Sequence, residues 1–199
     1  MPYQTVPKGE AKMEYMTFLK IMHLTGVIAG FGGALYTDFL ILTGGILKPL
    51  NEQTLTEVKR MARFVASGLL LLWLSGIVLA YEIILKNPNF LNNDKFWAKV
   101  AIVGVLTLNG IFIHGYVLRA AKKSLNKRLL VDSSLPVFLI LTLSGALSFV
   151  SWVIPFILGK SPEFSYVIPF ENIMAIWFAT VLILVAGILT LVSGATIVR

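Results

Sequence analysis

The sequence is poor in cysteine, histidine and charge. Its 199 residues include no cysteine, two histidines and 14% charged residues. The lack of cysteine excludes disulfide bonds, thiolate metal sites, iron–sulfur clusters and covalent c-type haem attachment. Soluble domains carry about 25% charged residues, so the deficit argues against an ordinary soluble enzyme. Acidic residues are rarer than basic ones: the chain has 10 Asp and Glu and 17 Lys and Arg, which gives a net charge of +7.

Apolar residues are correspondingly abundant. They make up 57% of the chain, 16 glycines come in addition, and the mean hydropathy is +0.82. A globule of this size lacks the interior volume to bury so many apolar side chains, whereas a bilayer has no such limit. The sequence therefore predicts an integral membrane protein. Its positive charge then indicates basic loops beside anionic lipid, and no nucleic-acid partner is expected.

Five apolar segments are long enough to span a bilayer, which takes about 20 residues. They cover residues 17–46, 64–85, 96–118, 135–158 and 172–198. The polar stretches between them, 48–63, 86–95, 119–134 and 159–171, are predicted to be loops. Asn93, Ser134, and either Ser165 or Glu171 are the predicted caps of the last three helices. The prediction is an all-α polytopic membrane helix bundle of five transmembrane helices, forming one domain over residues 1–199.

The distribution of Lys and Arg predicts an orientation, since these residues are enriched in cytoplasmic loops. Ten of the 17 lie on the side of the membrane that holds the first loop, the third loop and the C-terminus. They include a cluster between Arg119 and Arg128 and the C-terminal residue, Arg199. Seven lie on the other side. We expect the N-terminus outside and the C-terminus in the cytoplasm.

Few ionisable residues lie within the spans, and such residues are candidate functional groups by default. They are Lys20, His23 and Asp38 in the first span, Lys99 and His114 in the third, and Arg63 at the entry to the second. Asp38 follows His23 by fifteen residues, and His114 follows Lys99 by fifteen residues. Fifteen residues correspond to about 22 Å of helical rise. We therefore predict two pairs: His23 with Lys99 near the outer face, and Asp38 with His114, joined by Arg63, near the inner face. A haem ligated by both histidines is disfavoured.

Small residues share the face of His23. Gly26 and Gly30 lie within about 60° of it at 100° per residue. They predict either close helix packing or a slot for a flat ligand. In the fourth span Ser144, Ser148 and Ser151 are expected to form a polar packing stripe, and Trp73, Trp152 and Trp177 to be core or interface rings. Each of these candidate residues could also have a purely structural role. His23 could be a hydrogen-bonded histidine of the bundle, and Lys99 could snorkel to the headgroups. Asp38 and His114 could form a structural ion pair.

Three local motifs carry a resemblance to a known family. They are FLKIMHLTG at 18–26, RMAR at 60–63 and KFWAKVAIV at 95–103. In their order and spacing the chain resembles the CopD/HemJ-like superfamily of small bacterial inner-membrane proteins, over roughly the first three spans. In the HemJ branch a histidine of the first span and a lysine of the third are the key residues, and His23 and Lys99 match those positions. The chain departs from that branch in having a fifth span.

The resemblance implies a haem b- or porphyrin-binding redox protein of the HemJ protoporphyrinogen oxidase type. His23 would ligate the haem iron, Lys99 would ligate it too or pair with a propionate, and Gly26 and Gly30 would give the macrocycle room. Asp38 and His114 could serve a second site. A quinone or a redox partner subunit would take the electrons, because no nicotinamide or flavin fingerprint is present.

Two alternatives remain. The CopD branch implies copper transport or delivery, for which Met13, Met16, Met22 and His23 offer soft thioether and imidazole ligands. The other alternative is a non-catalytic subunit of a membrane complex, whose intramembrane polar groups serve helix pairing. The sequence leaves the oligomeric state open, a homo-oligomer included.

Overall fold

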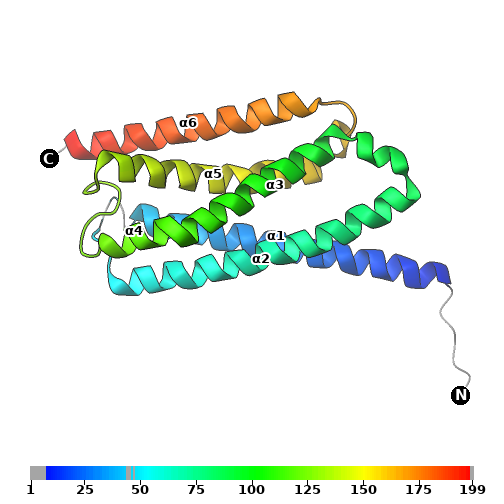
Figure 1. Cartoon of the computed structure of the whole chain (residues 1–199), viewed down its shortest axis with the longest axis horizontal. Helices are drawn as coiled ribbons and strands as arrows, with labels where there is room; N and C mark the ends of the chain where they lie inside the picture. The colour runs from blue at the N-terminus through cyan, green and yellow to red at the C-terminus, as the bar shows by residue number, and fades with distance from the viewer. Residues whose placement is uncertain (1–7, 44–45, 47, 198–199) are drawn as a thin grey trace, which may run out of the picture.

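The computed structural model describes residues 8–43, 46 and 48–197, and over these residues the chain forms helices joined by short turns, with no strand. Five of its helices are long and apolar enough to cross a membrane, which confirms the predicted all-α bundle. In Figure 1 these helices lie side by side along the long axis of the molecule. The spans are Met13–Leu42, Glu52–Lys86, Asp94–Lys123, Leu135–Lys160 and Phe170–Ser193.

Helices α1 (Lys8–Leu42) and α2 (Glu52–Lys86) form an antiparallel hairpin with the most extensive helix contact in the bundle. Helix α3 (Asp94–Phe112) runs through a π-helical segment, η3 (Ile113–Val117), into α4 (Leu118–Lys123). Helices α5 (Leu135–Lys160) and α6 (Phe170–Ile197) complete the bundle (Figure 1). The α3 helix packs on α5 and α6, and α1 also contacts α5, so that α5 joins the two halves.

The second span begins earlier than the sequence predicts. Helix α2 starts at Glu52, whereas residues 48–63 are predicted as a loop. Asn51 caps the helix, because its side chain accepts a hydrogen bond of 2.7 Å from the backbone N–H of Thr54. Leu55 and Val58 are buried on the inner face of these first turns. Hydropathy alone could not find this amphipathic, charged part of the helix, since only one of its faces is apolar.

Other predicted boundaries shift by a few residues. Helix α4 extends to Lys123, and α6 begins at Phe170, so neither Ser165 nor Glu171 caps it. Asn93 and Ser134 do precede α3 and α5 as predicted, although neither side chain makes a capping hydrogen bond. Residues 44 and 45 of the first predicted span lie outside the described residues, as do residues 1–7, residue 47 and residues 198–199.

Glycines allow α1 and α2 to approach closely. A Cβ on Gly68 of α2 would lie 2.6 Å from the backbone N of Gly30 and 3.0 Å from the carbonyl oxygen of Gly26, both on α1. Real Cβ atoms do not approach backbone so closely, so a side chain here would force the helices apart. Gly26 and Gly30 therefore serve helix packing, the first of the two interpretations of their spacing.

Polar side chains join the other helices. Asn109 of α3 donates to the Ser144 carbonyl at 2.8 Å and accepts from the Ser144 hydroxyl at 2.9 Å. The Trp177 indole of α6 donates to the Ser151 hydroxyl at 3.1 Å. Because Ser144, Ser148 and Ser151 are all buried, the predicted polar packing stripe of α5 is confirmed. Asn109, its partner, was not singled out in the sequence.

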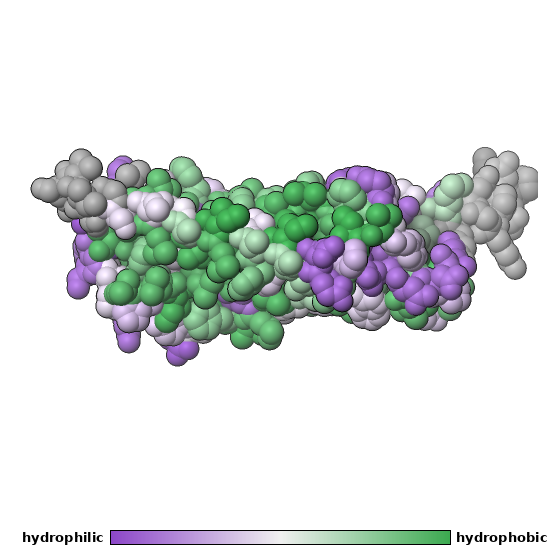
Figure 2. Space-filling model, turned by 90° about the horizontal axis from the view of Figure 1, so that it is seen from above, coloured by the Kyte–Doolittle hydropathy of each residue, from purple (hydrophilic) through white to green (hydrophobic). Residues whose placement is uncertain are grey.

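The outward faces of the bundle are apolar. Figure 2 shows a broad hydrophobic surface, with hydrophilic residues gathered in patches toward the ends of the molecule. Large side chains on this surface include Leu74, Ile77 and Ile183, which are 57%, 60% and 71% exposed. Aliphatic groups exposed to this extent on every long helix suit contact with lipid tails.

Candidate functional site

His23 lies on α1 and faces α2. Its imidazole is half-buried over Gly76, where a Cβ would lie 3.2 Å from the His23 Cε1 atom. The His23 Nδ1 atom is 3.1 Å from the Ser75 hydroxyl oxygen. Ser75 itself is 4% exposed and donates to the carbonyl oxygen of Leu71 at 2.6 Å. The absence of a side chain at Gly76 thus brings the ring within reach of a buried hydroxyl.

These contacts determine which ring nitrogen of His23 carries the proton. A serine hydroxyl has one hydrogen, and the shorter bond, to Leu71, uses it. The Ser75 oxygen must then accept, so Nδ1 of His23 donates to it. With Nδ1 as the donor to Ser75, the lone pair of the neutral imidazole is left on Nε2. The ring also makes a hydrogen bond to the backbone of Leu72. Such a second-shell bond to Nδ1 is the usual support of a histidine that ligates through Nε2.

Lys99 completes the pair predicted near this end of the bundle. Its charge interacts with that of His23, so the two groups on α1 and α3 lie near each other. Lys99 is half-buried. Their proximity agrees with the predicted pairing. Ser75 was missed, although a serine within the apolar run of α2 was the available signal.

The slot expected beside Gly26 and Gly30 is not open. A Cβ on Gly26 would lie 2.9 Å from the backbone N of Leu72, and one on Gly30 would lie 2.6 Å from Cζ2 of Trp152. Backbone of α2 and the indole of α5 therefore occupy this face of α1. The expectation that these glycines give a macrocycle room is wrong in this structure, because a flat protein side chain already fills the space.

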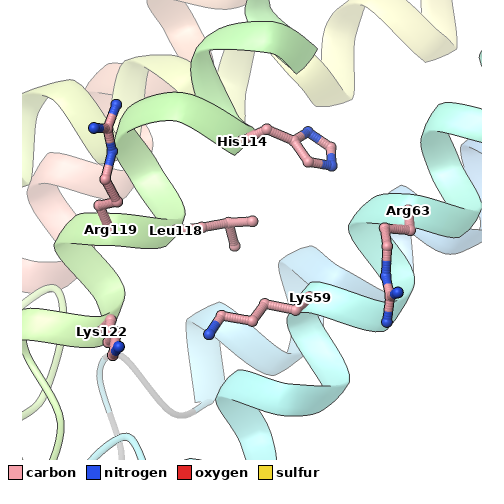
Figure 3. Close-up of a pocket in the computed structure, with 6 residues that line it drawn as sticks. All are labelled: Lys59, Arg63, His114, Leu118, Arg119 and Lys122. Atoms are coloured by element: carbon pink, nitrogen blue, oxygen red, sulfur yellow. The ribbon is translucent and has the colours of Figure 1, made fainter.

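The second predicted pair, Asp38 with His114, does not form. Within the described part of the chain Asp38 makes no salt bridge or side-chain hydrogen bond. His114 lies in η3, where its Nδ1 donates to the Gly110 carbonyl at 2.9 Å. In Figure 3 its imidazole points toward α2, not toward α1, which carries Asp38. Helical rise placed the two residues at one depth, but rotation about the axes turns His114 to another neighbour.

His114 instead contributes to a basic groove, a cavity of about 390 Å³ between α2 and the α3–α4 helix. Figure 3 shows the side chains of Lys59 and His114 extending toward the space between these helices. The predicted proximity of Arg63 and His114 is confirmed, because both line this groove. The lining residues are Lys59, Arg63, His114, Leu118, Arg119 and Lys122.

The metal-binding capacity of the outer end rests on few groups. The described residues contain no group of three or more His, Cys, Asp or Glu side chains that could hold a metal ion. A haem iron, in contrast, takes as few as one protein ligand, and the imidazole of His23 fits that need. A propionate takes a cation, and Lys99 fits that need. Gly26 and Gly30 contribute no space for the macrocycle.

Comparison with known proteins adds no relative. No family model, no curated protein and no solved structure matches the chain. The CopD/HemJ resemblance therefore stays a prediction that rests on the three sequence motifs.

Proposed function

We propose that this protein is a multi-pass membrane protein that binds a haem b- or porphyrin-type ligand through His23. Lys99 would hold a ligand carboxylate by charge. The protein would act in tetrapyrrole redox chemistry, as the resemblance to the HemJ branch implies.

One observation carries the proposal: the hydrogen bond between His23 Nδ1 and Ser75 Oγ, at 3.1 Å. It orients the imidazole and leaves Nε2 as a lone-pair donor. The second support is the electrostatic proximity of Lys99, since a buried cation favours an anionic partner.

The roles of the residues follow from this geometry. Ser75 positions His23, His23 ligates, and Lys99 pairs with a propionate. Direct ligation by Lys99 would require a neutral amine, so the ion pair is the role we assign. When bound, a haem would supply reversible one-electron chemistry. A quinone or a partner subunit is the electron acceptor in this proposal, because the chain has no nicotinamide or flavin fingerprint.

The proposal includes a membrane and an orientation. We place the protein in a bacterial inner membrane with its basic groove in the cytoplasmic leaflet. Lys59, Arg63, Arg119 and Lys122 gather at that end of the bundle, as the positive-inside rule favours.

The test is the visible spectrum of the purified full chain supplied with haem, with the haem content measured as the pyridine haemochrome. We expect a Soret band in the unchanged protein. His23→Ala should lower the haem content about tenfold or more, since it removes the iron ligand. Lys99→Ala should lower haem affinity severalfold while the band position is kept, because the iron ligand remains.

Matched control variants distinguish haem binding by His23 and Lys99 from a purely structural role of these residues. His114→Ala and Lys20→Ala remove the same residue types at exposed positions, and both should keep the His23-dependent band. Circular dichroism shows whether each variant is folded. A Soret band of full intensity in folded His23→Ala would contradict the proposal, as would loss of stability in the His23 and Lys99 variants with no change in cofactor content. The latter is expected of a non-catalytic subunit.

A further inference from the structure

The basic groove is lined by four cationic side chains, and the described residues that line it include no carboxylate. Lys59 and Arg63 reach it from α2, and Arg119 and Lys122 from α4. Among the described residues none of these four makes a salt bridge, and the one such bridge on this end joins Arg128 and Asp132. Four cations around one cavity repel each other, and an anion between them would remove that repulsion.

The groove lies where a bilayer places its headgroups. Helix α2 has 35 residues, about 52 Å of rise, which exceeds the hydrocarbon thickness of about 30 Å. Lys59 and Arg63 lie in the first third of this helix, before its apolar run, and Lys122 lies in the last turn of α4. Both helices therefore pass through the headgroup region at the groove.

The lining of the groove combines charge with apolar surface. Leu118 and the aliphatic stems of the lysines and arginines lie beside the charged groups. A ligand with a phosphate and attached hydrocarbon matches this combination better than a free ion. The volume of about 390 Å³ falls within the roughly 300–1,000 Å³ of small-ligand sites.

The π-helical turn shapes the same place. Segment η3 carries His114 into the groove, and the Gly115 carbonyl of η3 accepts a hydrogen bond from Arg119 Nε. That bond holds the Arg119 side chain along its own helix at the rim of the groove (Figure 3). Isolated π-turns within α-helices often occur at functional sites.

We propose that the basic groove binds the phosphate-bearing headgroup of an anionic phospholipid. Arginine binds phosphate oxygens in a bidentate manner, and lysine adds a mobile point charge. Basic pockets between transmembrane helices at the headgroup level are suited to such lipids. This site is separate from that of His23 and does not depend on it.

The experiment is native mass spectrometry of the full chain in detergent, titrated with phosphatidylglycerol or, as the neutral probe, phosphatidylcholine. The groove variant combines Arg63→Gln with Lys122→Gln. The control variant combines Arg60→Gln with Lys123→Gln, which are exposed neighbours at the same end that do not line the groove. Both variants lose one Arg and one Lys, so they change the net charge equally.

We expect the groove variant to bind phosphatidylglycerol about 25 times more weakly, because each of the two basic residues contributes about fivefold. The control variant should change by less than about threefold, since its charges act only through solvent. Equal weakening in the two variants would overturn the proposal, because it would indicate diffuse surface attraction. If the double variant does not fold, Lys59→Gln alone, at an exposed position, should still weaken binding about fivefold, and an unchanged affinity would equally overturn the site.

A competition arm distinguishes a lipid from a soluble anion. Inorganic phosphate at millimolar concentration should leave phosphatidylglycerol bound, because it cannot use the apolar part of the groove. Displacement of the lipid by phosphate, together with phosphate binding that the groove variant loses, would assign the groove to a soluble phosphate and overturn the lipid assignment.

Discussion

Ser75 determines how the imidazole of His23 can act. Its hydroxyl hydrogen is used by Leu71, so its oxygen accepts from Nδ1 of His23. The tautomer of the histidine therefore follows from a backbone carbonyl four residues before Ser75 in α2. The proposal that His23 is a ligand depends on this chain of bonds, and so it can be tested at Ser75 without removing the histidine.

Ser75→Ala removes the acceptor for His23 Nδ1. We expect the free energy of unfolding to fall by about 1 kcal/mol, because a buried donor loses its partner. Under the proposed function the haem affinity should also fall by about 10- to 100-fold, as with other second-shell losses. Ser67→Ala is the control, since Ser67 is exposed on the same helix and bonds only to the Arg63 carbonyl. Unfolding in denaturant and haem titration measure the two effects. An identical result for both serines would contradict the role of Ser75.

At the scale of the helices, the crossing of α1 and α2 is the tightest contact of the bundle. Gly26, Gly30 and Gly68 bring backbone against backbone, and Trp152 of α5 covers Gly30 from the other side. Lipid is as apolar as a helix surface, so close packing of this kind is what drives helix association in a membrane.

Gly68→Ala should disrupt this crossing. Its Cβ would meet the backbone of Gly30, which cannot yield as a flexible side chain can. We expect a loss of about 1–3 kcal/mol in the free energy of unfolding, as for other overpacked sites. Gly32→Ala is the matched control on α1, where nothing lies within 4 Å of an added Cβ. It should be neutral or stabilising by up to about 1 kcal/mol. Unfolding of the two variants in detergent measures the difference, and equal stabilities would refute the close approach.

At the scale of the whole molecule, an apolar belt separates two polar ends of unequal charge. The basic groove marks one end, and the loop around η2 (Pro88–Asn92) marks the other. Figure 1 places α4 and the start of α2 together, away from the turn that joins α2 to α3. The bundle thus has two distinguishable membrane faces, and its orientation can be measured directly.

Labelling of introduced cysteines tests this orientation, because the chain has none of its own. We expect a membrane-impermeant maleimide to label Asn89→Cys in intact spheroplasts. Lys127→Cys, in the loop beside the groove, should be labelled only after lysis, as the positive-inside rule requires. Both positions are exposed, and the cysteine-free chain shows the background. Labelling of Lys127→Cys in intact spheroplasts would reverse the orientation.

The sequence by itself determined the membrane class and the five apolar spans, and it predicted the pairing of His23 with Lys99. Apolar length and helical rise are local properties, and they translate directly into depth along a helix. The predicted contact between Asp38 and His114 does not form, because the depth of a residue along its helix does not determine which neighbouring helix its side chain faces.

Only the tertiary structure decided the contacts across helices. It brought Ser75 to His23, filled the face of Gly30 with Trp152, and assembled the basic groove from α2 and α4. The partners lie 52 residues apart in the first case and 122 residues apart in the second. Their meeting depends on helix rotation and crossing, which packing of the whole bundle sets and which no local pattern encodes.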